Sequence, residues 1–179
     1  NIYDGATFLG TVTATGTSWT FTTATLSNGA HSFTAKEADA AGNESTASAA
    51  RTLTVDNTPP TVTVTDNVPG TANIATVTSR ILYTYTFSES VTGLATNDFT
   101  VTNGTVNSVS GSGTTWTVNV TPTNGINGPA FVTMVLAAGA VSDAAGTPNA
   151  INTNSAQALD TLVATPTVSL ANDTGTSNT

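Results

Sequence analysis

Apolar and polar residues alternate with a period of two in several short stretches of the chain. The alternation is clearest in residues 17–21, 30–35, 62–65 and 115–120. A period of two places successive side chains on opposite faces of a half-buried strand. Turn-forming Gly, Asn and Asp residues separate these stretches, as at Asp4-Gly5, and no stretch keeps the helical period. The pattern therefore predicts an all-β chain.

The same sequence features return after about 100 residues. Trp19 and Trp116 are 97 positions apart, and the two Asp-Ala-Ala-Gly loops that begin at Asp39 and Asp143 are 104 positions apart. A period of roughly 100 residues is typical of an immunoglobulin-like (Ig-like) β-sandwich. The sequence therefore predicts tandem Ig-like β-sandwich domains.

Residues 56–61 are predicted to join two such domains. Pro59 and Pro60 fix an extended backbone and cannot donate ladder hydrogen bonds, which favours a stiff connector over a hairpin. A similar segment begins at Asp160. We therefore expect the C-terminal part of one repeat in residues 1–57, a complete repeat in residues 58–161, and a linker with the first strand of a following repeat in residues 162–179. In this division the first domain is incomplete at its N-terminus.

Composition narrows the classes of partner. The chain has 3 Lys and Arg residues against 11 Asp and Glu residues, a net charge of -8, and no cysteine. A nucleic acid or an anionic membrane surface would require basic patches, so neither is an expected partner. The absence of cysteine excludes a disulfide-stapled domain. The longest apolar run, residues 131–141, is shorter than the roughly 20 residues of a membrane helix and is predicted to be a buried strand.

Several motifs together resemble a known family. The motifs lie in predicted strands, in predicted turns and at the joint. They are Ile2-Tyr3-Asp4-Gly5, Trp19-Thr20-Phe21, Asp39-Ala40-Ala41-Gly42-Asn43, Asp56-Asn57-Thr58-Pro59-Pro60 and Phe87-Ser88-Glu89-Ser90. The chain resembles the bacterial Ig-like tandem repeats of giant surface adhesins of the RTX or biofilm-associated type. The resemblance implies a structural stalk at the bacterial cell surface, with neighbouring repeats of the same chain as partners. It also implies that the chain is no enzyme and that calcium is bound at the joints.

The positions of the acidic residues suggest where calcium would bind. In a seven-strand sandwich, the loop after the second strand and the loop between the last two strands lie at the end where the domain begins. This topology places Asp56 of the joint near Glu89 and Asp143. At the far end, Asp66 and Asp160 follow the first and last strands and form a weaker candidate pair. The alternative is that these acids only form turns, which Asp does often; the resemblance favours calcium, which takes 6–8 oxygen ligands.

Other candidate sites have structural interpretations. His31 is the only histidine, no Gly-x-Ser-x-Gly motif is present, and we expect His31 to be a surface residue of a strand. Trp19 and Trp116 could be sugar-binding platforms, but matching tryptophans in two sandwiches are more often buried between the sheets. We therefore predict that both are core anchors.

Two further functions stay open. Residues 165–170 resemble the first strand of the second repeat, residues 58–64. They could fill the incomplete first domain of another copy, so that copies associate head to tail as a filament by strand complementation. Alternatively the chain is a window cut from a longer array. A glycan-binding or protein-binding Ig-like module is the remaining alternative.

Overall fold

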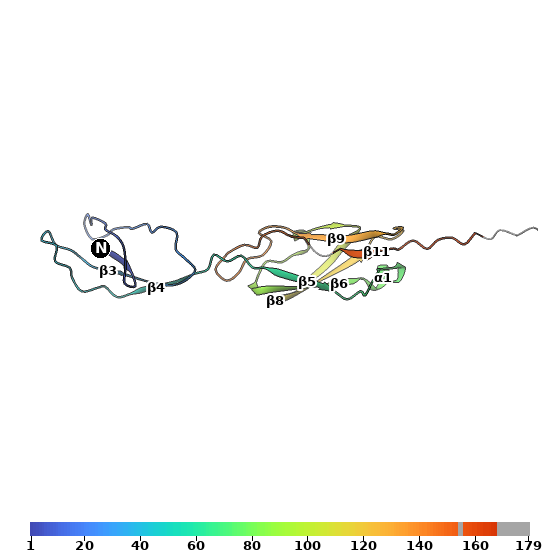
Figure 1. The fold of residues 1–179 in the computed structure, drawn as a ribbon, viewed down its shortest axis with the longest axis horizontal. Coiled ribbons are helices and arrows are strands. Elements are labelled where there is room, and N and C mark those ends of the chain that lie inside the picture. Colours follow the sequence, from blue (N-terminus) through green and yellow to red (C-terminus); the bar gives the residue numbers. More distant parts are fainter. Residues whose placement is uncertain (154–155, 168–179) are drawn as a thin grey trace, which may run out of the picture.

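The computed structural model describes residues 1–153 and 156–167, and it has two elongated domains that follow one another in line (Figure 1). The first domain contains strands β1 to β4, and the second contains every element from β5 to β11. Among the described residues, every strand pairs only with strands of its own domain. The predicted all-β class is confirmed.

The first domain has a single described sheet. Its strands are β1 (Ile2–Asp4), β2 (Thr7–Gly10), β3 (Gly29–Ala35) and β4 (Arg51–Val55), in the antiparallel order β2-β1-β3-β4. Gly5 has a φ of 57°, a left-handed conformation that glycine adopts without strain and that closes the predicted hairpin between β1 and β2.

Two predictions for the first domain are wrong. Residues 17–21 form no strand, and Trp19 is 47% exposed. A strand needs a neighbouring backbone for its hydrogen bonds, and within residues 1–57 no described strand pairs with this segment. The described part of this domain also has no second sheet opposite the first, so Trp19 has no two layers to be buried between. Because Trp19 is exposed, burial is no longer an argument against its being a sugar-binding platform.

A third prediction, that His31 lies at the surface, is also wrong. His31 lies on β3, but its side chain is buried at 8% exposure and not at the surface. The ring nitrogen Nδ1 contacts Asp4 Oδ2, Nε2 lies 2.8 Å from the carbonyl oxygen of Ser27, and the ring stacks on Phe33. A buried histidine is stable here because both ring nitrogens have partners.

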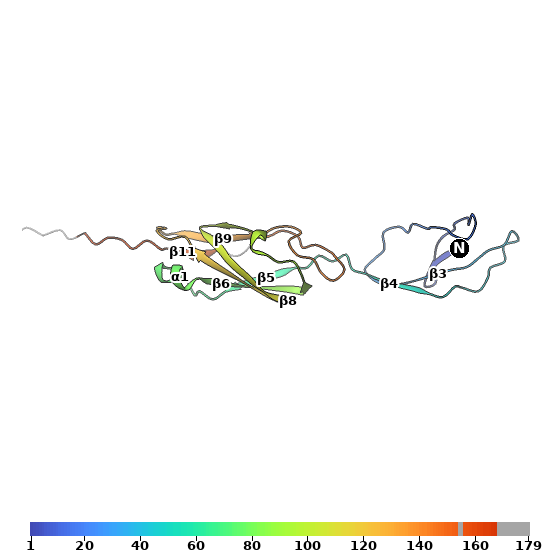
Figure 2. The same cartoon turned by 180° about the vertical axis from the view of Figure 1, so that it is seen from behind.

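The second domain is a sandwich of two antiparallel sheets (Figures 1 and 2). One sheet contains β5 (Val62–Asp66), β6 (Ile81–Val91) and β8 (Gly104–Pro122), in the order β5-β6-β8. The other contains β10 (Asn152–Thr153), β9 (Ala130–Leu136) and β11 (Gln157–Leu159), and β7 (Phe99–Thr102) also pairs with β9.

The long strand β8 doubles back on itself. Asn107 Nδ2 lies 2.8 Å from Thr121 Oγ1, although the two residues are 14 positions apart. Gly111 and Gly113 have φ values of 135° and 63° at the bend, and a Cβ on Gly111 would lie 2.5 Å from the carbonyl oxygen of Thr115. The bend therefore depends on glycine at this position.

The second domain also contains one short helix that the hydrophobic pattern did not predict. Helix α1 (Ile74–Ser79) lies between β5 and β6, and a 3-10 turn, η1 (Thr96–Asp98), precedes β7. Asn73 caps α1, because its side-chain oxygen accepts a hydrogen bond from the Ala75 amide at 2.9 Å. No helix among the described residues is long and apolar enough to cross a membrane.

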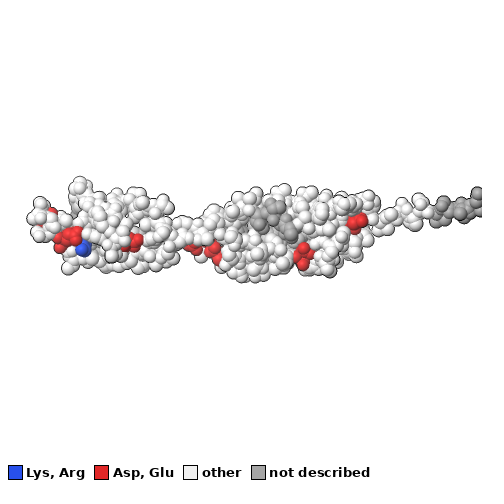
Figure 3. Space-filling view, viewed as in Figure 1, with Lys and Arg blue, Asp and Glu red and all other residues white. Residues whose placement is uncertain are grey.

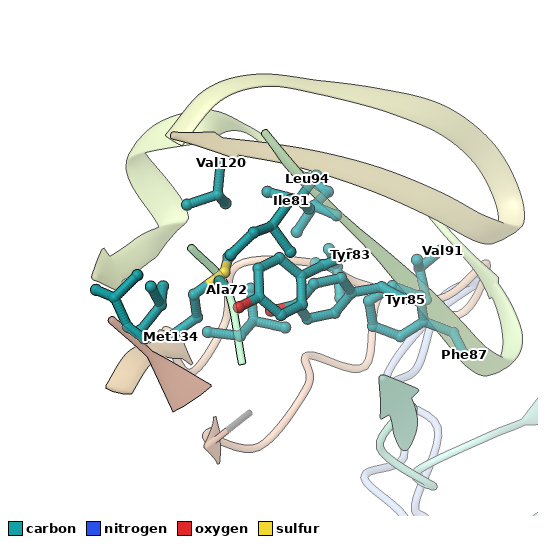
Figure 4. Close-up of a cluster of buried hydrophobic side chains, with 14 residues drawn as sticks. Ala72, Ile81, Tyr83, Tyr85, Phe87, Val91, Leu94, Val120 and Met134 are labelled. Carbon is teal, nitrogen blue, oxygen red and sulfur yellow. The ribbon is translucent and has the colours of Figure 1, made fainter. Parts of the chain in front are cut away.

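The core of the second domain follows from the alternation along β6. Ile81, Tyr83, Tyr85 and Phe87 all point between the sheets (Figure 4) and are at most 3% exposed. They pack with buried residues of β8 and β9, which include Val118, Val120, Val132, Met134 and Leu136. Trp116 packs against this core but is only partly buried. Burial of each large side chain contributes about 1.5–3 kcal/mol. This core holds β6, which carries Glu89, and β9, which precedes the loop of Asp143.

Candidate metal centre at the joint

Three acidic residues converge where the second domain begins. Asp56 directly follows β4, Glu89 is near the end of β6, and Asp143 lies in the loop between β9 and β10. Each offers a carboxylate oxygen, and these three oxygens all lie within 4.8 Å of one another. Acidic atoms are visible at the waist between the two domains, with no Lys or Arg atoms beside them on the face shown (Figure 3). The structure therefore places the three residues together as the Ig-like topology predicts.

Asp143 is held by its own loop. Its Oδ1 accepts hydrogen bonds from the backbone amides of Ala145 and Thr147, both at 2.8 Å. Its Oδ2 is buried and has no hydrogen-bond partner among the described residues, and Asp143 as a whole is 7% exposed. Burying an ionised oxygen without a partner is costly. An orphaned, buried carboxylate oxygen beside two further acids is the feature expected of a cation ligand.

Glu89 lies on the inner face of its sheet. It has the same parity along β6 as the buried residues Phe87 and Val91, and it is partly buried at the end of the sandwich. Burial raises the pKa of the Glu89 carboxyl, and the negative charges of Asp143 and Asp56 raise it further. The ionised form of Glu89 is therefore disfavoured unless a positive charge is present.

Asp56 belongs to the joint itself. Its Oδ1 accepts a hydrogen bond from the Thr58 amide at 3.0 Å, and its backbone carbonyl accepts one from Thr147 Oγ1 at 2.6 Å. On the other side, Asn28 of the first domain accepts a hydrogen bond from the Asn57 amide at 2.8 Å and donates one to Thr58 Oγ1. Both domains thus hold the joint, and its acid faces the second domain.

The second predicted pair, Asp66 and Asp160 at the far end of the domain, stays a prediction. Asp66 Oδ1 accepts a hydrogen bond from the Val68 amide at 2.9 Å, and Asp160 Oδ1 accepts one from the Leu162 amide at 3.3 Å. Each carboxylate therefore shapes a local turn, as those of Asp56 and Asp143 also do. Among the described residues, only Asp56, Glu89 and Asp143 form a group of three or more potential metal ligands.

Sequence reasoning missed the two residues that hold the joint in place, Asn28 and Thr147. Neither carries a charge, and their partners are backbone groups and a hydroxyl of a distant segment. The repeat did contain a signal for Thr147. The Asp-Ala-Ala-Gly sequence is followed by Asn43 in the first domain but by Thr147 in the second. Asn28 offers no comparable signal beyond its place before Gly29.

The donor set is suited to a hard cation. Asp143 Oδ2, the second oxygen of Asp56 and the two oxygens of Glu89 make up to four carboxylate oxygens, and water can complete the shell. Ca²⁺ takes 6–8 oxygens in flexible geometry, whereas Zn²⁺ prefers nitrogen and sulfur ligands, which this group lacks. The residues present therefore fit Ca²⁺.

Comparison with family models gives two matches. A model described as a bacterial Ig-like domain matches residues 1–57, and a second model with the same description matches residues 56–159, which are more than half of the chain. The chain belongs to the bacterial Ig-like domain family. Domains of this family are typically non-catalytic structural modules and are common in extracellular or surface proteins. No curated protein and no solved structure shows a significant match to this pair of bacterial Ig-like domains.

Proposed function

We propose that these bacterial Ig-like domains are a stalk segment of a cell-surface adhesin or extracellular fibre, and that Ca²⁺ bound at the joint holds consecutive domains in line. The observation that carries the proposal is the convergence of Asp56 of the joint with Glu89 and the orphaned Asp143 Oδ2 of the second domain. A divalent cation would offset three clustered negative charges that otherwise repel one another.

The placement of the ligands supports a mechanical role. Asp56 lies on the connector, whereas Glu89 and Asp143 lie on the body of the second domain. A cation bound by all three would tie the connector to that body. The stiff backbone at Pro59 and Pro60 and the hydrogen bonds of Asn28 and Thr147 already limit the movement of the connector. Calcium would then set how rigidly the two domains are aligned.

Calcium binding is tested by thermal unfolding of the chain in Ca²⁺ and in chelator. A ligand present at 100 times its Kd and bound only to the folded state stabilises that state by about 2.7 kcal/mol. We expect the second domain of the unaltered chain to melt at a higher temperature in Ca²⁺, and we expect Glu89→Gln to remove this shift. Glu37→Gln is the matched control, because Glu37 is an exposed acid of the first domain outside the group. Identical melting of the unaltered chain in both conditions would contradict the proposal.

A second candidate function is association of copies by strand complementation. Strand β4 lies at the edge of the described sheet, and Leu53 on this strand is 50% exposed. Such an edge can pair with an added strand. The donor predicted for it, residues 165–170, extends beyond the described residues from position 168, so this hypothesis stays a prediction. Deletion of residues 165–179 should abolish self-association, and a shortened chain that still assembles would rule the hypothesis out.

A further inference from the structure

The two domains contain loops with the same backbone conformation. In each loop the first Asp accepts hydrogen bonds at Oδ1 from the amides two and four positions later, at 2.9 Å for Asp39 and 2.8 Å for Asp143. The backbone carbonyl of the Asp also accepts a hydrogen bond from the glycine amide in both loops. The two glycines, Gly42 and Gly146, have φ values of 86° and 87°. The loops therefore differ in side chains and not in backbone fold.

The difference that matters is at the last loop position. In the first domain, Asn43 Nδ2 donates a hydrogen bond to Asp39 Oδ2 at 2.9 Å, so both oxygens of Asp39 have partners. This side-chain hydrogen bond is the largest of the effects that lower the pKa of Asp39. In the second domain the same position is Thr147, which has no amide group. Asp143 Oδ2 is consequently left without a partner.

Thr147 uses its side chain differently. Its Oγ1 donates a hydrogen bond to the backbone carbonyl of Asp56 at 2.6 Å, across a sequence separation of 91 residues. This hydrogen bond holds the backbone of Asp56, and therefore its carboxylate, next to the loop that carries Asp143. One residue leaves a ligand oxygen free and also positions the connector that supplies another ligand.

We infer that residue 147 determines whether this loop can bind a divalent cation. Asn at this position closes the loop on its own carboxylate, and Thr leaves the carboxylate open toward the joint. The inference rests on the proposed calcium site and adds a specificity-determining residue to it. On this inference the Asp-Ala-Ala-Gly sequence, present in both domains, does not by itself mark a cation site.

The test is a Thr147→Asn variant of the whole chain, which keeps all three carboxylates and the net charge. Calcium titration by calorimetry should show at least a tenfold loss of affinity, because the introduced amide bonds Asp143 Oδ2 as Asn43 bonds Asp39. Asn43→Thr, the reciprocal change in the first domain, is the matched control and should leave the affinity unchanged. An unaltered affinity of Thr147→Asn would overturn the inference.

A Thr147→Val variant separates the two roles of Thr147. It removes the hydroxyl that bonds the Asp56 carbonyl but introduces no amide, so Asp143 Oδ2 stays open. We expect its calcium affinity to fall less than that of Thr147→Asn. If the two variants lose the same affinity, the hydroxyl and not the closing of the loop controls binding, and the inference is wrong.

Hydrogen exchange of the side-chain amide, measured by NMR in chelator, tests the loop without calcium. In Thr147→Asn, the Nδ2 protons of the new residue should exchange slowly, as we also expect for the hydrogen-bonded amide of Asn43, whereas the amide of Asn127 should exchange fast. Fast exchange at position 147 would refute the closed loop even if calcium binding to the unaltered chain is found. Slow exchange together with no calcium binding by the unaltered chain would confirm the closed loop and refute the proposed function.

Discussion

The hydroxyl groups of Tyr83 and Tyr85 lie inside the core of the second domain, and no described residue gives either of them a hydrogen-bond partner (Figure 4). Burial raises the pKa of both phenols far above the usual range, so both stay neutral. An unsatisfied buried polar group costs about 1–3 kcal/mol. The two residues therefore contribute to stability through their rings and not through their hydroxyls.

We expect Tyr85→Phe to leave the free energy of unfolding unchanged or to raise it by about 1 kcal/mol, because it removes an unpaired oxygen from the core. Urea unfolding followed by circular dichroism measures the change. Tyr3→Phe is a useful comparison, since the Tyr3 hydroxyl donates a hydrogen bond to Glu44 Oε1 at 2.8 Å and its loss should be destabilising. Clear destabilisation by Tyr85→Phe would show that its hydroxyl has a partner, such as a buried water.

His31 makes the stability of the first domain depend on pH. The hydrogen bond to Asp4, the contact with the Ser27 carbonyl and the negative charge of Asp4 raise the pKa of His31 above 6.5, and burial opposes them. The hydrogen bond to His31 is also the main cause that lowers the pKa of Asp4. A raised histidine pKa stabilises the fold below about pH 6.5, and this contribution is lost as the pH rises through the folded value. The Asp4 contribution is present above about pH 4 and is lost as the pH falls through its lowered folded value.

The first domain should consequently be more stable at pH 5 than at pH 8. Hydrogen exchange of the β3 amides, measured at both pH values and corrected for the intrinsic exchange rate, tests this. His31→Gln should remove most of the difference, because glutamine does not titrate. Equal protection of the unaltered chain at the two pH values would contradict the assignment of a charged His31–Asp4 pair.

At the scale of elements, the alternating pattern predicted most strands, and the reasons for its failures are physical. Helix α1 has six residues, too few for a helical period to be recognised in the sequence. Residues 17–21 alternate as a strand should, but alternation shows only that a segment could cover a core and not that a partner strand is present. The burial of His31 depends on Asp4 and Ser27, which lie on other segments.

A further prediction at the scale of elements concerns the N-terminal cap of α1. Asn73 accepts a hydrogen bond from the Ala75 amide, and Thr76 Oγ1 accepts one from the Asn73 amide, so the helix start is satisfied from both sides. Asn73→Ala should lower the free energy of unfolding of the second domain by about 0.5–2 kcal/mol. Asn127→Ala, at an exposed position of the same domain, serves as the control in the same urea titration. Equal effects of the two changes would mean that the cap does not stabilise the domain.

The candidate site could be predicted in part because it depends on topology. Asp56, Glu89 and Asp143 are far apart in the sequence, but an Ig-like sandwich brings the ends of their strands to one edge. The orphaned state of Asp143 Oδ2 could not be predicted, because it depends on which side chain stands at position 147. Asp66 and Asp160 also accept a hydrogen bond from the amide two positions later, so this local contact does not distinguish a residue of the three-acid group from one outside it.

At the scale of the whole molecule, the two bacterial Ig-like domains form a rod with one connector between them (Figure 1). The connector is held by hydrogen bonds from Asn28 on one side and Thr147 on the other. A typical hydrogen bond adds only about 0.5–1.5 kcal/mol, and less where water competes, so these bonds alone allow the joint to open. A cation at the acidic group would add the stronger restraint.

The measurement that tests this account most directly is the distribution of distances across the joint. The chain has no cysteine, so spin labels can be attached at Thr52→Cys and Thr115→Cys, both exposed positions in β4 and β8. Pulsed electron spin resonance should give a narrow distance distribution in Ca²⁺ and a broader one in chelator. The same pair of labels with Glu89→Gln should give the broad distribution in both conditions. A distribution of the same width with and without Ca²⁺ in the unaltered chain would contradict the claim that calcium holds the two domains in line.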